Sequence, residues 1–228
     1  GIAFDPSSDL GRQATVGVLV AMVLATALGW TIFKVAARRW GEETADLPMT
    51  LDTAVDPEVD HIRGLEDAQL TLVEFVDFEC SYCAHATGSW EDLHKRFGDD
   101  LRYVVRHLPH HPHGPLAARA SEAAAKQDMF WPWLDFVFTK QDALEREDLI
   151  GYATELGLDV TAFVKDLDSA EVAARVERDV ASAAASGAHA TPTFFIDGNR
   201  MTGSYDARTL TATLESSRRG ARTKESQA

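Results

Sequence analysis

The segment 70–83, LTLVEFVDFECSYC, places an apolar run directly before two cysteines that are three positions apart. Its β-branched and aromatic residues over 70–78 predict a buried strand. After the cysteines, apolar residues return at the spacing of one helical face: Ala86, Trp90, Leu93 and Phe97. Residues 101–106, LRYVVR, then predict a second strand. Strand, helix and strand in this order favour a parallel pair joined by a right-handed crossover.

Farther along, the chain predicts helices, a short hairpin and a closing helix. The helices are expected at residues 116–127, 130–138, 148–156, 161–167 and 170–186. Residues 193–196, TFFI, predict a strand that turns at 197–199 into a partner strand at 200–202. Asp206 is the expected N-cap of a final helix that ends at Ser216. The order β-α-β, an all-helical insertion and β-β-α predicts an α/β chain with the thioredoxin fold.

Residues 14–33, ATVGVLVAMVLATALGWTIF, carry no charge and predict one N-terminal transmembrane helix in contact with membrane lipid. Twenty helical residues span about 30 Å, the thickness of a bilayer core. A buried helix of a soluble protein is the alternative, whereas a signal peptide is disfavoured because no basic stretch precedes the run. Lys34, Arg38 and Arg39 follow the span, so the positive-inside rule favours a cytoplasmic globular domain at the cell membrane.

The chain divides into four expected parts: residues 1–40 with the transmembrane helix, an acidic linker at 41–60, the globular domain at 61–216 and a flexible basic tail at 217–228. Because Gly1 stands where an initiator Met would, we expect a processed chain or a piece of a longer one. The formal net charge of −14 argues against a nucleic-acid partner, since phosphate contacts need clustered Lys and Arg. Two cysteines are too few for a secreted disulfide scaffold.

Cys80 follows the predicted strand and begins the predicted helix. Unpaired amides and the helix dipole favour an anion at such a position, and a thiolate is the form that attacks a disulfide. We therefore expect Cys80 to be a nucleophile with a lowered pKa and Cys83, one turn on, to be the more buried resolving cysteine. A structural crosslink is one alternative, but closing a loop of about four residues stabilises by only roughly 2 kcal/mol. A zinc site is the other, and it would need two histidines, of which His85 is a candidate by proximity.

Two further positions are candidates for chemistry at the dithiol. Thr191-Pro192 precedes the 193–196 strand, and in this fold a cis proline lies beside the dithiol, where its neighbour offers backbone atoms to a substrate chain. A trans proline that merely begins a strand is the alternative. Glu74 lies in an otherwise apolar strand, where a buried carboxyl would have a raised pKa and relay a proton to or from Cys83. An outward-facing strand residue is the alternative for Glu74.

A histidine cluster follows the second predicted strand: His107, His110, His111 and His113. Prolines interrupt the cluster, so we expect a solvated loop, and a transition-metal site is the alternative. Because the cluster follows the C-terminal end of a strand, it is expected near the active face. We expect neither a metal nor a cofactor at the dithiol.

From residue 61 to 216 the chain resembles the DsbA-like branch of the thioredoxin superfamily, on the segments 75–83, FVDFECSYC, and 190–198, ATPTFFIDG. The resemblance implies dithiol/disulfide oxidoreductase activity on thiol or disulfide protein substrates, together with a redox partner. It implies that Cys80 attacks, Cys83 resolves and Glu74 is the buried acid of the family. Substrate contacts are expected at Ser81, Tyr82, Thr191 and Pro192. Many relatives have Pro where this chain has Ser81, which leaves oxidase, reductase and isomerase open.

Residues 2–36 resemble the last transmembrane helix of NhaA-type sodium/proton antiporters, on the segments 2–4, IAF, 16–19, VGVL, and 27–29, ALG. Some such antiporters carry a DsbA-like domain at the C-terminus. This resemblance implies a second hypothesis, in which the chain is the redox-sensing C-terminal part of an antiporter whose remainder is its partner. The ion-binding aspartates of the antiporter are not in this sequence, so transport by this chain alone is not expected. A non-enzymatic binding or zinc module is the third hypothesis.

Overall fold

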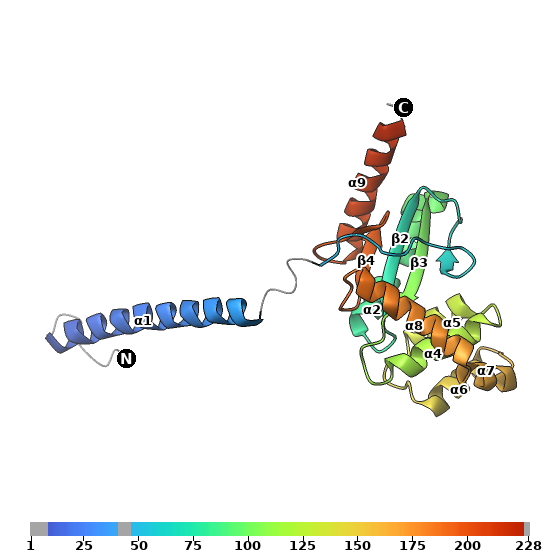
Figure 1. Ribbon diagram of the computed structural model, residues 1–228, viewed down its shortest axis with the longest axis horizontal. Helices are drawn as coiled ribbons and strands as arrows, with labels where there is room; N and C mark the ends of the chain where they lie inside the picture. The colour runs from blue at the N-terminus through green and yellow to red at the C-terminus, as the bar shows by residue number, and fades with distance from the viewer. Residues whose placement is uncertain (1–8, 41–46, 226–228) are drawn as a thin grey trace. The chain divides into compact units, whose positions relative to one another are not determined.

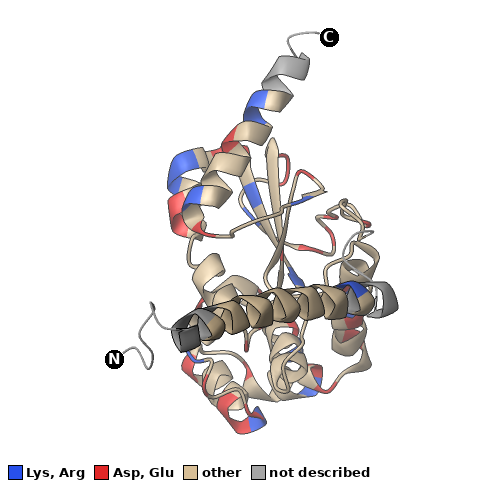
Figure 2. Cartoon of the chain, turned by 90° about the vertical axis from the view of Figure 1, so that its left-hand side faces the viewer, with Lys and Arg blue, Asp and Glu red and all other residues tan. Residues whose placement is uncertain are grey.

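The computed structural model describes residues 9–40 and 47–225, and its chain separates into two compact units, residues 1–47 and 48–228 (Figure 1). The first unit contains the helix α1 (Asp9–Trp40). Within it, Val16–Val35 has a mean hydropathy of 2.2 and is long and apolar enough to cross a membrane. Figure 2 shows this helix almost free of charged residues along that stretch. The helix agrees with the apolar span expected at 14–33, and residues 1–8 of its expected N-terminal flank lie outside the described residues.

In the described part of the second unit, five strands form one sheet in the order β1-β3-β2-β4-β5. They are β1 (His61–Arg63), β2 (Leu70–Val76), β3 (Leu101–His107), β4 (Thr193–Ile196) and β5 (Asn199–Arg200). β2 and β3 are parallel, whereas β4 runs antiparallel to β2 and β5 antiparallel to β4. This topology confirms the β-α-β and β-β-α halves of the thioredoxin fold. The short strand β1, antiparallel to β3, was not predicted.

The helices follow the expected order, with one break. The two after the cysteines are α2 (Ser81–Thr87) and α3 (Trp90–Phe97), because the chain leaves the helix at Gly88 and Ser89. A short 3₁₀ turn, η1 (Gly98–Asp100), then leads into β3. The insertion contains α4 (Gly114–Ala125), α5 (Phe130–Val137), α6 (Arg146–Glu155), α7 (Val160–Leu167) and α8 (Ala170–Ala185). Figure 1 shows the insertion gathered at the end of the sheet where α2 begins.

Alternate residues of β2 enter two different cores, as the period of a strand requires. Leu72 and Val76 belong to the larger core, which α2, α3 and the insertion complete with aromatic side chains such as Trp133. Val73 and Phe75 belong to a smaller core on the other face, against Ala183 of α8. Glu74 points to the same face of β2 as Leu72 and Val76, so its carboxyl lies among the apolar side chains of the larger core.

The segment before the sheet is part of the second unit. The amide of Leu51 donates to the carbonyl of Gly198 at 2.8 Å, and Arg106 donates to the carbonyls of Thr53 and Ala54 at 2.9 and 3.0 Å. The same guanidinium binds both carboxylate oxygens of Asp60, at 3.0 and 2.8 Å. Packed structure therefore begins at Pro48, which corrects the linker expected over 41–60 and the domain start expected at 61. Residues 41–46 lie outside the described part.

The closing helix is longer than expected. α9 (Ala207–Glu225) continues past Ser216, where the flexible tail was expected to begin, and packs beside β2 and β4. Its Arg218 guanidinium finds partners on the domain, since it lies 3.7 Å from Asp100 and 5.4 Å from the ring of Phe97. Because the helix continues to Glu225, the tail boundary expected at 217 is corrected.

Candidate active site

Cys80 is the N-cap of α2 and closes a tight turn between β2 and the helix. Its amide donates to the Asp77 carbonyl at 3.1 Å, and its carbonyl accepts from the amides of Cys83 and Ala84 at 3.1 and 3.3 Å. Gln141, from the loop between α5 and α6, donates its side-chain amide to the carbonyls of Phe78 and Cys80 at 2.7 and 2.9 Å. The insertion thus fixes the turn that presents the first cysteine.

The pKa values of the two thiols are shifted in opposite directions. A hydrogen bond from the Cys83 thiol, the Thr191 side chain and the backbone amides of Cys83 and Tyr82 together lower the pKa of Cys80 to about 5, against the opposing effect of burial. Burial raises the pKa of Cys83 well above its ordinary value, and the neighbouring Cys80 and Glu74 raise it further. At neutral pH Cys80 is a thiolate and Cys83 a thiol, which is the division between attacking and resolving sulfurs that the spacing predicted.

The Thr191–Pro192 peptide bond is cis, as predicted, and it lies beside Cys80. The Sγ of Cys80 is 3.4 Å from the Thr191 carbonyl oxygen, to which the thiol form donates. This approach follows from sheet pairing: β4 begins immediately after the proline, and its Thr193 lies opposite Phe75 of β2. The strand that leads to the cysteines is therefore the neighbour of the strand that follows the proline.

Ser81 and Tyr82, between the cysteines, face solvent. Tyr82 is 62% exposed, and its ring lies 5.9 Å from the ring of Tyr205 in an edge-on arrangement. Ser81 lines an open groove of about 430 Å³ together with Glu79, His113 and Gln141. Both residues are accessible to a partner that reaches Cys80.

Glu74 is fully buried, so the outward-facing alternative is wrong. Burial raises the pKa of this carboxyl to about 8; the hydrogen bond that one oxygen accepts from the Tyr103 hydroxyl opposes the shift, and the charge of Cys80 adds to it. Glu74 in turn helps to raise the pKa of Cys83, so the carboxyl and the resolving thiol lie within electrostatic reach. Tyr103 was missed in the sequence, although its place two residues into the 101–106 strand gives it the parity of an inward-facing residue.

The loop after β3 is tied to the segment before Cys80. The Asp77 carboxylate accepts from the backbone amides of His110 and His111 at 2.6 and 2.9 Å and lies 2.8 Å from Nδ1 of His111, whose pKa it raises. Nδ1 of His113 lies 3.1 Å from Glu79. These contacts hold the loop near the active face, as expected, while His110 and His111 remain exposed to solvent, which confirms the expected solvated loop. Asp77, Glu79 and Gln141 were missed, because apolar periodicity carries no signal for such contacts.

His61, His85 and His107 bind other partners than the cysteine thiols. His107 is buried in β3, where its Nε2 and that of His61 lie 2.8 and 2.9 Å from the same carboxylate oxygen of Glu122. The donor atoms of this trio lie within 4.8 Å of one another, a spacing that a metal ion would accept. However, the Arg175 guanidinium lies 3.8 Å from that same oxygen and opposes a cation there, so the trio fits an ion-pair network. His85 turns its Nδ1 to the Ser81 carbonyl at 3.3 Å.

Comparison with solved structures identifies the fold independently. A thioredoxin-like oxidoreductase from Silicibacter pomeroyi DSS-3 matches with a TM-score of 0.65 and 25% identity, over 74% of this chain and 94% of that one. BdbD from Bacillus subtilis, in its oxidised form, matches with a TM-score of 0.64 and 24% identity, over 75% of this chain and 96% of that one. The α-DsbA1 of Wolbachia pipientis matches at 0.64 and 20%, over 75% and 96%.

The curated relatives carry a different name. The Na(+)/H(+) antiporter NhaA of Herminiimonas arsenicoxydans is 78% identical over 225 residues, which is 99% of this chain and 36% of that protein. The Na(+)/H(+) antiporter NhaA 1 of Mycolicibacterium gilvum is 45% identical over 219 residues, 94% of this chain and 35% of that protein. This chain therefore spans about a third of the length of these relatives.

The sequence profile of the family described as Thioredoxin matches residues 56–216. With this profile and the sheet topology in agreement, the chain belongs to the thioredoxin family.

Proposed function

We propose that this chain is a membrane-anchored thiol:disulfide oxidoreductase that works through the Cys80–Cys83 dithiol/disulfide couple. The observation that carries the proposal is the pair of opposed pKa directions at two thiols one helical turn apart, with Cys80 3.4 Å from the Thr191 carbonyl beside a cis proline. A thiolate next to a protonated resolving thiol is the resting state that dithiol exchange needs.

In the reducing direction, the Cys80 thiolate attacks one sulfur of a substrate disulfide. That S–S bond breaks, a mixed disulfide forms and the other substrate sulfur leaves as a thiolate. Cys83 then loses its proton and attacks Sγ of Cys80, which releases the second substrate sulfur and leaves the Cys80–Cys83 disulfide. The substrate gains two electrons and the dithiol loses them. Oxidation of a substrate dithiol is the same sequence in reverse.

Glu74 is the proposed proton acceptor for Cys83. A carboxyl with a pKa of about 8 is close to the working pH, which is where proton exchange with a reacting group is most efficient. Ser81, Tyr82, Thr191 and Pro192 form the proposed surface for the substrate chain. The exposed side chains of Ser81 and Tyr82 and the Thr191 carbonyl beside Cys80 support this assignment.

Trapping the mixed disulfide tests the proposal. In Cys83→Ala, Cys80 can attack but no thiol resolves the adduct. The reduced variant, mixed with a disulfide-containing protein, should therefore accumulate a covalent complex that dithiothreitol cleaves. The matched control is Cys80→Ala, in which the buried, protonated Cys83 should form no adduct. If Cys83→Ala yields no complex with any disulfide protein offered, the proposed activity is wrong.

The NhaA relatives support a second candidate, in which the domain is the redox-sensing C-terminal part of a sodium/proton antiporter. In a parent antiporter, Cys80→Ser should then change the response of transport to an oxidant; transport that is indifferent to the substitution would exclude this role.

The positive charges after the span support a cytoplasmic domain. Treating intact cells with a membrane-impermeant thiol reagent tests this placement. A cytoplasmic Cys80 should remain unlabelled until the cells are lysed.

A further inference from the structure

A small cavity lies beside Glu74 in the larger core. Its volume is about 10 Å³ and its walls are apolar except for three side chains, those of Glu74, Thr87 and Tyr103. We call it the inner cavity. About 10 to 15 Å³ measured with a water-sized probe is the room that one water molecule needs, and a buried water also needs two or more polar partners. The inner cavity meets both conditions.

Two polar atoms on this cavity have no well-placed partner. Oε1 of Glu74 and Oγ1 of Thr87 are each buried, and neither has a partner in good hydrogen-bond geometry in the described part of the chain. The Tyr103 hydroxyl donates to the other oxygen of Glu74, and the Thr87 side chain lowers the pKa of Tyr103 as a weak hydrogen-bond donor. Because buried polar atoms are almost always hydrogen-bonded, two such atoms on one water-sized cavity point to a shared ligand.

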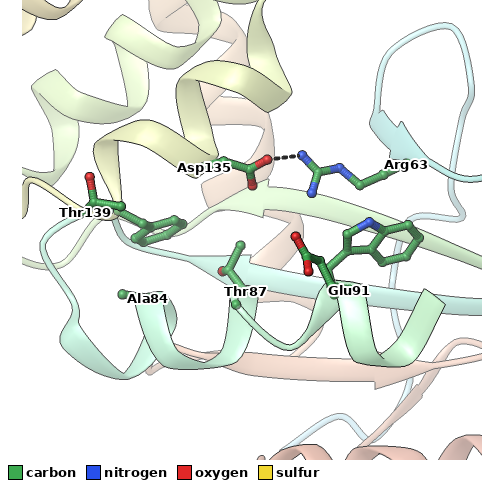
Figure 3. Close-up of a pocket in the computed structure, with 9 residues that line it drawn as sticks. Arg63, Ala84, Thr87, Glu91, Asp135 and Thr139 are labelled. Carbon is green, nitrogen blue, oxygen red and sulfur yellow. Dashed lines mark hydrogen bonds and ion pairs between the residues drawn. The ribbon is translucent and has the colours of Figure 1, made fainter. Parts of the chain in front are cut away.

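Thr87 also lines a second, larger space. An outer pocket of about 300 Å³ opens between α2, α3 and α5, and its wall includes Arg63, Thr87, Trp90, Glu91 and Asp135. Figure 3 shows Thr87 on α2 facing this pocket, beneath the ion pair in which Arg63 lies 2.6 Å from Asp135. Thr87 and Trp90 therefore line both the outer pocket and the inner cavity.

We propose that one water molecule in the inner cavity bridges Oε1 of Glu74 and Oγ1 of Thr87, and that the Thr87 hydroxyl passes protons between this water and the outer pocket. Glu74 then exchanges protons with solvent through α2, by a route whose lining excludes both cysteines. Thr87 is a positioning residue, since it acts on the dithiol only through Glu74. The functional part of this inference rests on the proposed role of Glu74.

The protons balance in either direction. When Cys83 is deprotonated for attack on Cys80, Glu74 takes that proton and becomes a neutral carboxyl. It then gives a proton to the bridging water, which passes one to the Thr87 hydroxyl while that hydroxyl releases its own to the outer pocket. The hydroxyl and the water are unchanged at the end. When Cys83 leaves as a thiolate, the same route runs inward from solvent.

The substitution Thr87→Val tests the route, because it keeps the shape of the side chain and removes the hydroxyl. In the full 228-residue chain, the resolving step of a single turnover, measured as release of the second substrate thiol, should slow roughly tenfold; a missing relay removes only part of a general acid–base contribution of about 100-fold or more. The pH at which the rate of the resolving step is half-maximal should rise, because the Glu74 carboxylate loses a hydrogen-bond donor. Thr87→Ser should restore both.

Thr139→Val is the matched control, since Thr139 lines the outer pocket but not the inner cavity. It should leave the rate and the pH profile of the resolving step unchanged. A Thr87→Val chain whose profile superimposes on that of wild type would overturn the proposed route, as would a Thr139→Val chain that slows as much as Thr87→Val.

A second measurement needs no Thr87 variant to fold. The infrared band of the protonated Glu74 carboxyl, assigned by its loss in Glu74→Gln, should shift promptly when wild-type chain is moved into D₂O. A band that remains unshifted under native conditions would exclude a solvent route. This readout is independent of catalysis. Failure to trap a mixed disulfide would refute the proposed activity alone, and an unshifted band would refute the water route alone.

Discussion

Replacing Glu74 by Gln should convert a pH-dependent stability into a flat one. The carboxyl has an ordinary pKa of 4.5 and a folded-state pKa of about 8, so the folded chain holds this proton more tightly than the unfolded chain does. The stabilising contribution of the neutral carboxyl is therefore fully present below pH 4.5 and is lost as the pH rises through 8. Each unit of difference corresponds to about 1.4 kcal/mol, so the whole loss is on the order of 5 kcal/mol.

Urea unfolding of the reduced chain, followed by tryptophan fluorescence, measures this effect. Between pH 5 and pH 7.5, wild type should lose about 3 kcal/mol of unfolding free energy relative to Glu74→Gln. The amide is nearly isosteric and its oxygen still accepts from Tyr103, so the comparison isolates the ionisation. Glu91→Gln, which removes an exposed carboxyl of α3, controls for the loss of one negative charge. A free-energy difference between wild type and Glu74→Gln that stays constant over this pH range would show that burial does not raise the pKa of Glu74.

Three other outcomes follow from the geometry. Alkylation of the reduced chain by iodoacetamide should occur at Cys80 with a pH midpoint near 5, and a midpoint near 9 would contradict the proposed thiolate. Arg106→Met removes the two-pronged partner of the buried Asp60 carboxylate, which keeps the Arg178 cation at 3.3 Å, and should lower the free energy of unfolding by about 3 kcal/mol; a loss below 1 kcal/mol would refute that pairing. Gly114→Ala places a methyl group 2.5 Å from Oδ1 of Asp77 and should cost about 1 to 3 kcal/mol in the same assay, whereas Gly151→Ala, which meets open space, should not.

The local features of the fold were predictable because each has a local cause. The 193–196 strand was predicted at its observed bounds, since a run of apolar, β-branched and aromatic residues between a proline and an Asp-Gly turn has few other structures open to it. The meeting of Cys80 and Pro192 followed from the order of the elements, because that order pairs the strand before the cysteines with the strand after the proline.

What could not be predicted depends on tertiary contacts. Gln141 reaches the turn of Cys80 from an insertion whose placement is not encoded in its own periodicity. The segment from Pro48 to Asp60 has no period because it is held by one short backbone bridge around Leu51 and then by side-chain contacts to Arg106, not by a continuous strand or helix. The break at Gly88 is equally hidden, since Ala86, Leu93 and Phe97 still reach one core after the helix divides.

The grip of Arg106 on the segment that enters the sheet has a mechanical consequence. Its guanidinium holds the chain at Thr53, Ala54 and Asp60, all before the first strand, and also binds the hydroxyl of Ser182 at 3.0 Å. A pull transmitted along the backbone from residues before Pro48 would load the Leu51–Gly198 hydrogen bond and then these Arg106 bonds before it reached β2. Such a force would thus be borne by the segment that enters the sheet, and the sulfur chemistry would be shielded from it until those bonds break.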